Sequence, residues 1–202
     1  MEAHDNELIE KLELFVRKYY NNIAVRGCIL FAAILLALFL IVSLFEYYTY
    51  SNTIVRTCIF YGFLILNAGV LTGMILLPLF RKAGWLKRLS YEDAARLIGN
   101  HYPEIDDKLL KTLQLHELAE QNPEGYSLLD AAIERRIEQM KPFTFHKAID
   151  FRKNLKYLKY ALPPALIILL LLGWNSELFT GPTQRIIHHQ TAYEKPAPYQ
   201  FE

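Results

Sequence analysis

The sequence predicts an all-α membrane protein: three transmembrane helices, a small cytoplasmic helical domain between the second and the third, and an extended periplasmic tail. The first observation is composition, because 52% of the 202 residues are hydrophobic while 21% are charged. The second is that long uncharged runs alternate with polar stretches along the chain. The third is the helical spacing of apolar residues within the polar stretches. Together they indicate separate segments suited to lipid and to water.

The predicted segments follow one another along the chain. They are a cytoplasmic amphipathic helix (1–26), two transmembrane helices (27–48 and 57–80), a cytoplasmic helical module (81–145), a basic juxtamembrane helix (146–160), a third transmembrane helix (161–178) and a periplasmic extended segment (179–202). The net charge of +1 gives the chain no overall basic character, so the sequence does not indicate a nucleic-acid partner.

Three uncharged runs are the candidates for membrane-spanning helices. Residues 27–45 form a run of nineteen, 57–80 a run of twenty-four, and 160–176 a run of seventeen. A spanning helix needs roughly 20 apolar residues, so the first two qualify by length. The third is short, and a buried core helix is its alternative, but Tyr160 and Trp174 lie where interfacial aromatic residues are expected. The first run is too long for a signal peptide and no small-x-small cleavage site follows it, so we expect it to remain as an anchor.

The distribution of basic residues predicts the orientation in the membrane. Basic residues flank both ends of segment 81–159 and precede the first span, whereas the loop 46–56 has one and the chain after residue 176 has two. Lys and Arg next to spans stay on the cytoplasmic side. The N-terminus is therefore predicted to be cytoplasmic and the C-terminus periplasmic.

Small and polar residues within the first two spans suggest how these helices pack. Gly69 and Gly73 are a small-xxx-small pair, and Ala33 and Ala37 have the same spacing. Asn67 projects from roughly the opposite face, where an amide facing hydrocarbon would be costly, so we expect it to meet the third helix or another subunit. The predicted helix-packing residues are Ala33, Ala37, Gly62, Asn67, Gly69 and Gly73.

The segment before the first span is predicted to be an amphipathic helix. Leu8, Leu12, Phe15, Tyr19 and Ile23 recur at helical spacing along it. Their apolar stripe must be covered, either by the membrane surface or by the cytoplasmic domain.

The polar stretch that begins at residue 90 is predicted to form three short helices. Ser90 with Asp93 approximates a capping box for the first, which Gly99 ends. A second helix is expected from about 105 to 120, and Ser127 caps a third. Three such helices make a small all-α module.

This module lacks the residue patterns of an active site. A proline separates His101 from Glu104 and prevents a regular helical pairing, and Asp106 and Asp107 are adjacent, so they point in different directions. The chain has no Gly-rich phosphate loop, CxxC or HExxH motif. We expect no catalytic residue, metal site or cofactor. The exposed turn is instead expected to dock a partner through His101, Tyr102, Glu104, Asp106 and Asp107.

The segment 146–160 carries five basic residues and one acid. It is interpreted as a basic amphipathic helix on the anionic cytoplasmic surface; a plain solvated helix continuing into the membrane is the alternative. Pro163 and Pro164 are expected to bend the chain before the third span. The predicted lipid-surface residues are Lys147, Arg152, Lys153, Lys156 and Lys159.

The chain after the third span contains three prolines and scattered polar residues, which predict an extended segment. Residues 198–202 begin an alternating pattern typical of a strand. We therefore expect these 202 residues to be the anchored front of a longer protein.

Several motifs resemble a known family. "SYEDAARLIGNHYPEIDDKLLKTLQL", "VRKYYNN", "SLFEYY" and "KPAPYQF" are similar to the N-terminal region of a large bacterial inner-membrane family catalogued as a domain of unknown function. That resemblance implies three N-terminal transmembrane helices, a long periplasmic part, and genes often beside MoxR-type AAA+ ATPases and von Willebrand A-domain proteins. It supplies no catalytic residues.

The predicted function is a non-enzymatic anchor and scaffold of a cell-envelope complex, whose cytoplasmic module docks a soluble partner. The expected partners are other membrane or cytoplasmic proteins, such as an AAA+ ATPase and von Willebrand A-domain proteins, and anionic lipid. The alternative is a transmembrane signal transducer that holds a cytoplasmic factor. An enzyme ranks third, and its active site would lie beyond residue 202. The sequence does not define the oligomeric state.

Overall fold

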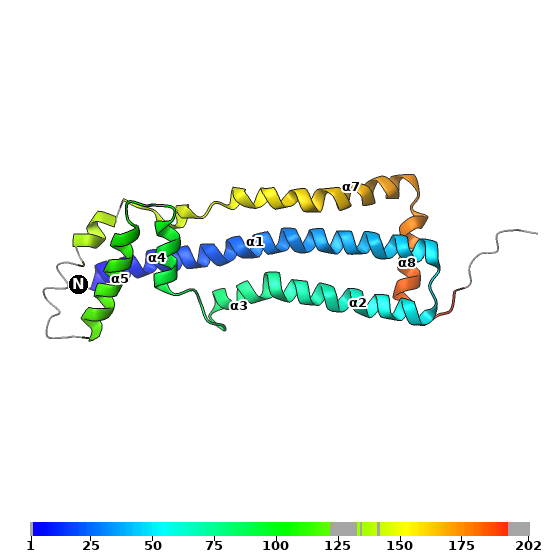
Figure 1. Ribbon diagram of the computed structural model, residues 1–202, viewed down its shortest axis with the longest axis horizontal. Coiled ribbons are helices and arrows are strands. Elements are labelled where there is room, and N and C mark those ends of the chain that lie inside the picture. The colour runs from blue at the N-terminus through cyan, green and yellow to red at the C-terminus, as the bar shows by residue number, and fades with distance from the viewer. Residues whose placement is uncertain (1, 122–132, 134, 141, 194–202) are drawn as a thin grey trace, which may run out of the picture. The chain divides into compact units, whose positions relative to one another are not determined.

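The computed structural model describes residues 2–121, 133, 135–140 and 142–193. Every regular element in these residues is a helix, which confirms the predicted all-α class for this part of the chain (Figure 1). The chain divides into two compact units. Unit 1 consists of Met1–Ile23 and Pro78–Arg152, and unit 2 consists of Ala24–Leu77 and Lys153–Glu202.

The helices of the described ranges follow one another along the chain. They are α1 (Glu2–Thr49), α2 (Thr53–Leu71), the π-helix η1 (Thr72–Leu76), α3 (Leu77–Ala83), α4 (Tyr91–Gly99), α5 (Asp106–Gln121), the 3-10 helices η3 (Phe145–Ala148) and η4 (Phe151–Tyr157), α7 (Leu158–Trp174) and α8 (Glu177–Ile187). Residues 135–140 are also helical.

Three stretches of helix are long and apolar enough to cross a membrane. They are Leu8–Thr49, Thr53–Ala83 and Phe145–Trp174. Large apolar side chains on α2 and α7 have no cover within the described residues; the most exposed include Ile54, Ile65, Leu169 and Leu170. Continuous exposed apolar surface of this kind is typical of a protein that lies in lipid. The number of spans agrees with the prediction. The third helix, at 158–174, begins and ends earlier than the predicted span 161–178. It ends at residue 174 because the backbone of Asn175 is extended.

Unit 1 has a hydrophobic core of its own. The predicted stripe on the first part of α1 lies in this core: Leu8, Leu12 and Phe15 are buried, and Tyr19 and Ile23 pack at its edge. The remainder of the core comes from the second segment of the unit and consists mainly of Ala94, Ala95, Ile98, Ile105, Leu109, Ile133, Ile137, Met140, Phe145 and Ile149. Of the two covers expected for the stripe, the structure therefore selects the helical module.

The short helices of unit 1 begin and end close to where the sequence predicts. The backbone N–H of Asp93 donates to Ser90 Oγ over 3.1 Å, so Ser90 caps α4, and the helix ends at Gly99 as expected. α5 matches the second predicted helix within one residue at each end. Ser127, the predicted cap of the third helix, lies outside the described residues.

The turn between the first two spans is shorter than the predicted loop 46–56. α1 continues to Thr49 and α2 begins at Thr53, because the side chain of Asn52 accepts a hydrogen bond from the backbone N–H of Val55 over 2.9 Å. This N-cap starts α2 early. Tyr50, with φ of 47°, reverses the chain direction in the left-handed region.

The glycines predicted to pack the first two spans are not the residues at which the structure brings two helices close together. In the described part of the chain, no atom beyond the adjoining helix backbone lies within 4 Å of the position that a Cβ would occupy at Gly62, Gly69 or Gly73. The close approach occurs at Gly27 of α1, where a Cβ would collide with the backbone carbonyl of Met74 in η1. Among the described residues these three glycines therefore make no close helix contact. Small-residue spacing shows that a helix permits close approach but not which neighbour uses it.

The other predicted packing residues of unit 2 are on the inner side of the helices. Ala33 is buried and Ala37 is partly buried. Asn67 is also buried, and its Nδ2 donates to the carbonyl of Phe63 on its own helix over 2.8 Å. Its Oδ1 has no hydrogen-bond partner among the described residues. The amide is therefore half satisfied by its own backbone. The contact expected with the third helix or another subunit stays a prediction.

The segment 146–160, predicted to be one basic amphipathic helix, is not a single α-helix. The chain there forms η3 and η4, two 3-10 segments, before α7 begins at Leu158. A 3-10 helix has three residues per turn, so its side chains are spaced differently around the axis from those of an amphipathic α-helix. Pro163 and Pro164 lie inside α7 and not before it.

The predicted extended segment after the third span is also wrong, for residues 179–187. These residues belong to α8, which lies across the ends of α1, α2 and α7 (Figure 1). Phe179, Pro182 and Arg185, spaced three apart, are buried. Packing of this buried face offsets the free-energy cost of the backbone hydrogen bond that Pro182 cannot make. The local composition of the segment does not indicate such packing. The predicted strand at 198–202 lies outside the described residues.

Candidate functional site: a buried ionic cluster

Three charged residues of unit 2 are buried together where its helices end. Glu46 is in the last turn of α1, Arg56 in the first turn of α2, and Arg185 in the last turn of α8. The side chains of Glu46 and Arg56 are fully buried, and that of Arg185 is 11% exposed. We call these three residues the ionic cluster.

Glu46 holds both arginines through one carboxylate oxygen. Arg56 donates to Glu46 Oε1 from Nε over 3.2 Å and from Nη2 over 3.0 Å. Arg185 Nε lies 3.3 Å from the same oxygen, close enough for an ion pair but without hydrogen-bond alignment. Arg185 Nη2 also donates to the backbone carbonyl of Glu46 over 3.3 Å. The ionic cluster thus brings two guanidinium groups against one carboxyl group.

Arg56 also connects the helices to the chain that follows α8. Its Nη2 donates to the carbonyl of Ser51 over 2.7 Å, and its Nη1 donates to the carbonyl of Thr191 over 2.9 Å. The Tyr193 ring lies 5.0 Å from the same guanidinium. A single side chain therefore joins the 50–52 turn, the end of α1 and the segment 188–193.

Ring contacts add to the ionic cluster in two places, at Arg185 and between segment 188–193 and α2. The Tyr50 ring lies 4.0 Å from the guanidinium of Arg185. His189 is buried, its Nδ1 is 3.1 Å from Thr57 Oγ1, and its ring stacks on Phe60 at a centroid distance of 4.7 Å. Cation–π contacts of desolvated arginines strengthen such an arrangement.

The chemistry available to the ionic cluster is structural. Glu46 Oε2 and Ser43 Oγ are buried without a hydrogen-bond partner in the described part of the chain. Within the described ranges, no group of three His, Cys, Asp or Glu residues is arranged to hold a metal ion. A buried ion pair of this kind is better suited to specifying one arrangement of chain segments than to increasing stability.

The residues predicted to bind a partner lie in unit 1 and surround the turn between α4 and α5. His101, Glu104 and Asp107 are exposed, and Ile105 beside them is buried in the core. The Tyr102 ring packs edge-on against Phe143 at 5.5 Å and against His101 at 4.7 Å. Asp106 begins α5, and its side chain lies outside the part described.

The predicted lipid-surface residues are all exposed. They are Lys147, Arg152, Lys153, Lys156 and Lys159. Within unit 2, the ammonium groups of Lys156 and Lys159 lie over their neighbouring tyrosine rings, Tyr157 and Tyr160. Ammonium groups beside amphipathic rings are a common arrangement where a helix enters a membrane surface.

The ionic cluster was not predicted from the sequence. Glu46 and Arg56 were expected only as the charged limits of spans, and Arg185 was expected in an extended tail. One signal was available: an acid and a base of opposite charge face each other across a short turn between two apolar helices, where an unpaired charge is costly.

No protein-family model, curated protein or solved structure matches the chain. The resemblance to the inner-membrane family therefore stays a prediction.

Proposed function

We propose that the protein is a non-enzymatic anchor and scaffold of a cell-envelope complex in the bacterial inner membrane. The observation that carries the proposal is the division of the chain into two units of different character. Unit 1 has a closed apolar core and a polar exterior, whereas α2 and α7 of unit 2 present apolar side chains outward. Such a chain combines a water-facing module with a lipid-facing anchor.

In this proposal unit 1 is cytoplasmic and docks a soluble partner. The charge distribution of the loops favours that orientation. The docking surface is the turn formed by His101, Tyr102, Glu104, Asp106 and Asp107. It combines exposed acids with a tyrosine ring held by packing, and rigid aromatic anchors ringed by polar groups are typical of protein interfaces. A MoxR-type AAA+ ATPase or a von Willebrand A-domain protein is the partner class that we propose, together with anionic lipid around the exposed basic residues.

The ionic cluster has a positional role in this proposal. By holding the segment 188–193 against α2, it sets where the chain leaves the membrane toward a periplasmic part. A scaffold needs that exit to be defined, because the outer and inner partners are joined only through the anchor.

A transmembrane signal transducer is the second candidate function. The observation that favours it is α1, a single helix of 48 residues that contributes both to the core of unit 1 and to the ionic cluster. A continuous helix is one means by which an outer signal would be passed to a cytoplasmic factor.

The docking proposal is tested by site-specific crosslinking of the full chain in bacterial membranes. A photoreactive amino acid at position 101 is expected to give an adduct with a co-expressed MoxR-type ATPase, and the same group at exposed Arg135 is not. Glu104→Lys with Asp107→Lys is expected to abolish the adduct. Glu92→Lys with Glu117→Lys makes the same charge change elsewhere on unit 1 and is expected to retain it.

The crosslinking outcomes test the docking surface, and a separate deletion experiment distinguishes the two candidate functions. Equal adducts at positions 101 and 135, or an adduct that survives the charge reversal at 104 and 107, would reject the proposed docking surface. Deletion of the gene distinguishes the scaffold from the transducer, since a transducer is expected to alter a defined set of transcripts and a scaffold is not.

A further inference from the structure

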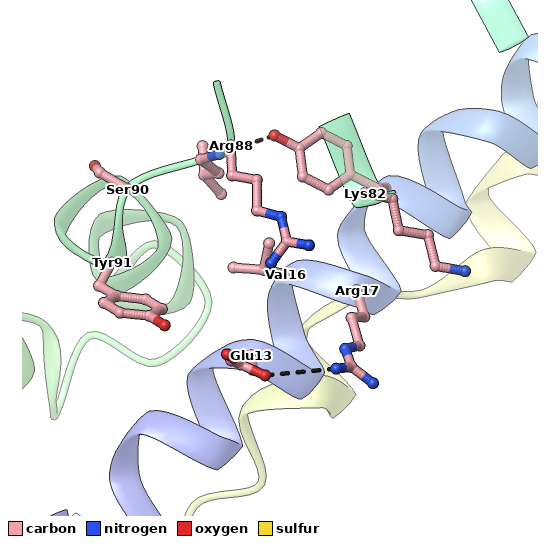
Figure 2. Close-up of a pocket in the computed structure, with 9 residues that line it drawn as sticks. Glu13, Val16, Arg17, Lys82, Arg88, Ser90 and Tyr91 are labelled. Carbon is pink, nitrogen blue, oxygen red and sulfur yellow. Dashed lines mark hydrogen bonds and ion pairs between the residues drawn. The ribbon is translucent and has the colours of Figure 1, made fainter. Parts of the chain in front are cut away.

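Unit 1 contains a pocket whose lining combines an apolar floor with a basic rim (Figure 2). Its cavity is about 200 Å³. The lining comes from the first part of α1, the end of α3 and the chain up to the start of α4. The residues are Glu13, Val16, Arg17, Tyr20, Lys82, Arg88, Leu89, Ser90 and Tyr91.

The floor of the pocket is rigid and apolar. Val16 and Tyr20 are buried members of the unit 1 core. The Tyr20 hydroxyl accepts a hydrogen bond from the backbone N–H of Leu89 over 2.9 Å, which fixes the chain before α4 against α1. The hydroxyl is the acceptor in this bond and keeps its own hydrogen for donation. The floor therefore presents the hydrocarbon of Val16 and of the Tyr20 ring, together with one O–H group, to a ligand.

The rim of the pocket is positively charged. Arg17, Lys82 and Arg88 line the pocket, each from a different segment. Figure 2 shows the guanidinium of Arg88 beside the side chain of Val16. Glu13 is the one acid in the lining; it pairs with Arg17 at 3.6 Å, and both side chains are largely exposed. Three cations and one carboxylate leave a charge of +2 on the rim. Exposed ion pairs are weak, so Arg17 remains available to an anion.

The position of Lys82 in the sequence indicates which anion is nearby. Lys82 precedes the last residue of the candidate span Thr53–Ala83, and Arg88 follows five residues after that span. In a protein that crosses a membrane, side chains at the end of a span lie at the depth of the lipid phosphates. Lys82 Nζ is also held toward α1 by Asn21 Oδ1 over 2.7 Å.

We propose that this pocket binds one anionic glycerophospholipid, with its phosphate between Arg17, Lys82 and Arg88 and the adjoining apolar part of the lipid on Val16 and Tyr20. Guanidinium groups bind phosphate through paired hydrogen bonds, and an ammonium adds a point charge. A lipid whose headgroup carries its own cation is disfavoured by the +2 rim. The inference rests on the membrane-spanning part of the proposed function and is independent of the docking surface.

The test uses the full chain purified in a non-ionic detergent, with retained lipid measured by native mass spectrometry. The probes are short-chain phosphatidylglycerol, short-chain phosphatidylcholine and inorganic phosphate. We expect one phosphatidylglycerol to bind per chain, more tightly than phosphatidylcholine. Replacing Arg17, Lys82 and Arg88 together with Gln is expected to weaken that binding roughly tenfold or more, since each basic group near a lipid surface contributes appreciably.

The matched control replaces three exposed basic residues of unit 1 outside the pocket, Arg96, Lys108 and Arg135, with Gln. It makes the same charge change and is expected to leave phosphatidylglycerol binding within about twofold of the unaltered chain, because these side chains line no part of the pocket. Single Arg88→Gln, at an exposed position outside the apolar core of unit 1, is the variant least expected to alter folding.

The outcomes are distinct. Equal weakening by the pocket and control triples, or no weakening by Arg88→Gln and the pocket triple, would overturn the proposal. Inorganic phosphate that displaces phosphatidylglycerol at similar concentration would identify a free-phosphate site and overturn the lipid assignment. The pocket triple is expected to keep the crosslink from position 101. If the pocket triple loses lipid binding but keeps the crosslink, only the pocket is affected. If a variant loses the crosslink but keeps lipid binding, only the docking surface is affected, so the two proposals can fail independently.

Discussion

Arg56 donates two hydrogen bonds to one carboxylate oxygen of Glu46, over 3.2 and 3.0 Å, and both side chains are completely buried. The two residues face each other across a turn of only three residues, 50–52, between the first two candidate spans. Arg185 approaches the same oxygen from α8. Pairing of the buried charged groups at the end of the spans is therefore coupled to the placement of α8 and of the chain that follows it.

Arg56→Met should destabilise unit 2 by about 3 kcal/mol, because it leaves Glu46 buried with a single misaligned partner. Arg185→Met is the matched comparison and should cost less, since Arg185 makes fewer hydrogen bonds and is slightly exposed. The measurement is unfolding of the full chain in mixed non-ionic detergent and SDS micelles. Equal losses for the two variants would contradict the assignment of Arg56 as the central residue of the cluster.

Gly27→Ala should lower stability by roughly 1–3 kcal/mol, because the new methyl group would collide with the backbone carbonyl of Met74 and force two helices apart. Gly69→Ala is the control: its methyl group would meet nothing, and replacing a helical glycine with alanine should be neutral or stabilise by up to about 1 kcal/mol. The same micelle unfolding assay measures both. The close approach would be disproved if the two variants shifted stability in the same direction.

Leu12→Ala should weaken unit 1 by about 2–5 kcal/mol, since Leu12 is fully buried between the first part of α1 and the 94–149 segment. Leu14→Ala, at a position 47% exposed, should have little effect. Hydrogen–deuterium exchange of the α4 and α5 amides reports the change within unit 1. Unaltered exchange in α4 and α5 of the Leu12 variant would show that α1 is not part of this core.

Cysteine labelling of whole cells tests the orientation. In a chain with Cys28 and Cys58 replaced by Ser, cysteine at exposed position 117 should react with an impermeant maleimide only after the inner membrane is opened. Cysteine at exposed position 190 should react in intact cells. The reverse labelling pattern would invert the predicted orientation and place the docking surface outside the cytoplasm.

Much of unit 1 could be predicted because its signals are local. The stripe on α1, the Ser90 cap and the break near Gly99 each depend on residues within one or two turns of one another. The cover of that stripe was left open, since the same apolar spacing suits a membrane surface and a protein core equally well.

The candidate sites depended on contacts that local patterns do not encode. The pocket joins Arg17 to Arg88, which are far apart in the chain, and neither belongs to a recognisable motif. The glycine pattern in the second span was real, but the contact partner of η1 is Gly27, because close approach depends on how two helices meet.

By itself, the sequence determined the helical class, the three apolar helices and the polar module between the second and third, because run length and periodicity act over a few residues. Only the tertiary structure decided that residues 177–187 are helical and that Arg56 and Arg185 share Glu46. Glu46 is 10 residues from one arginine and 139 from the other. A buried charge must find an opposite charge, but its partner is chosen by the packing that removes both from water.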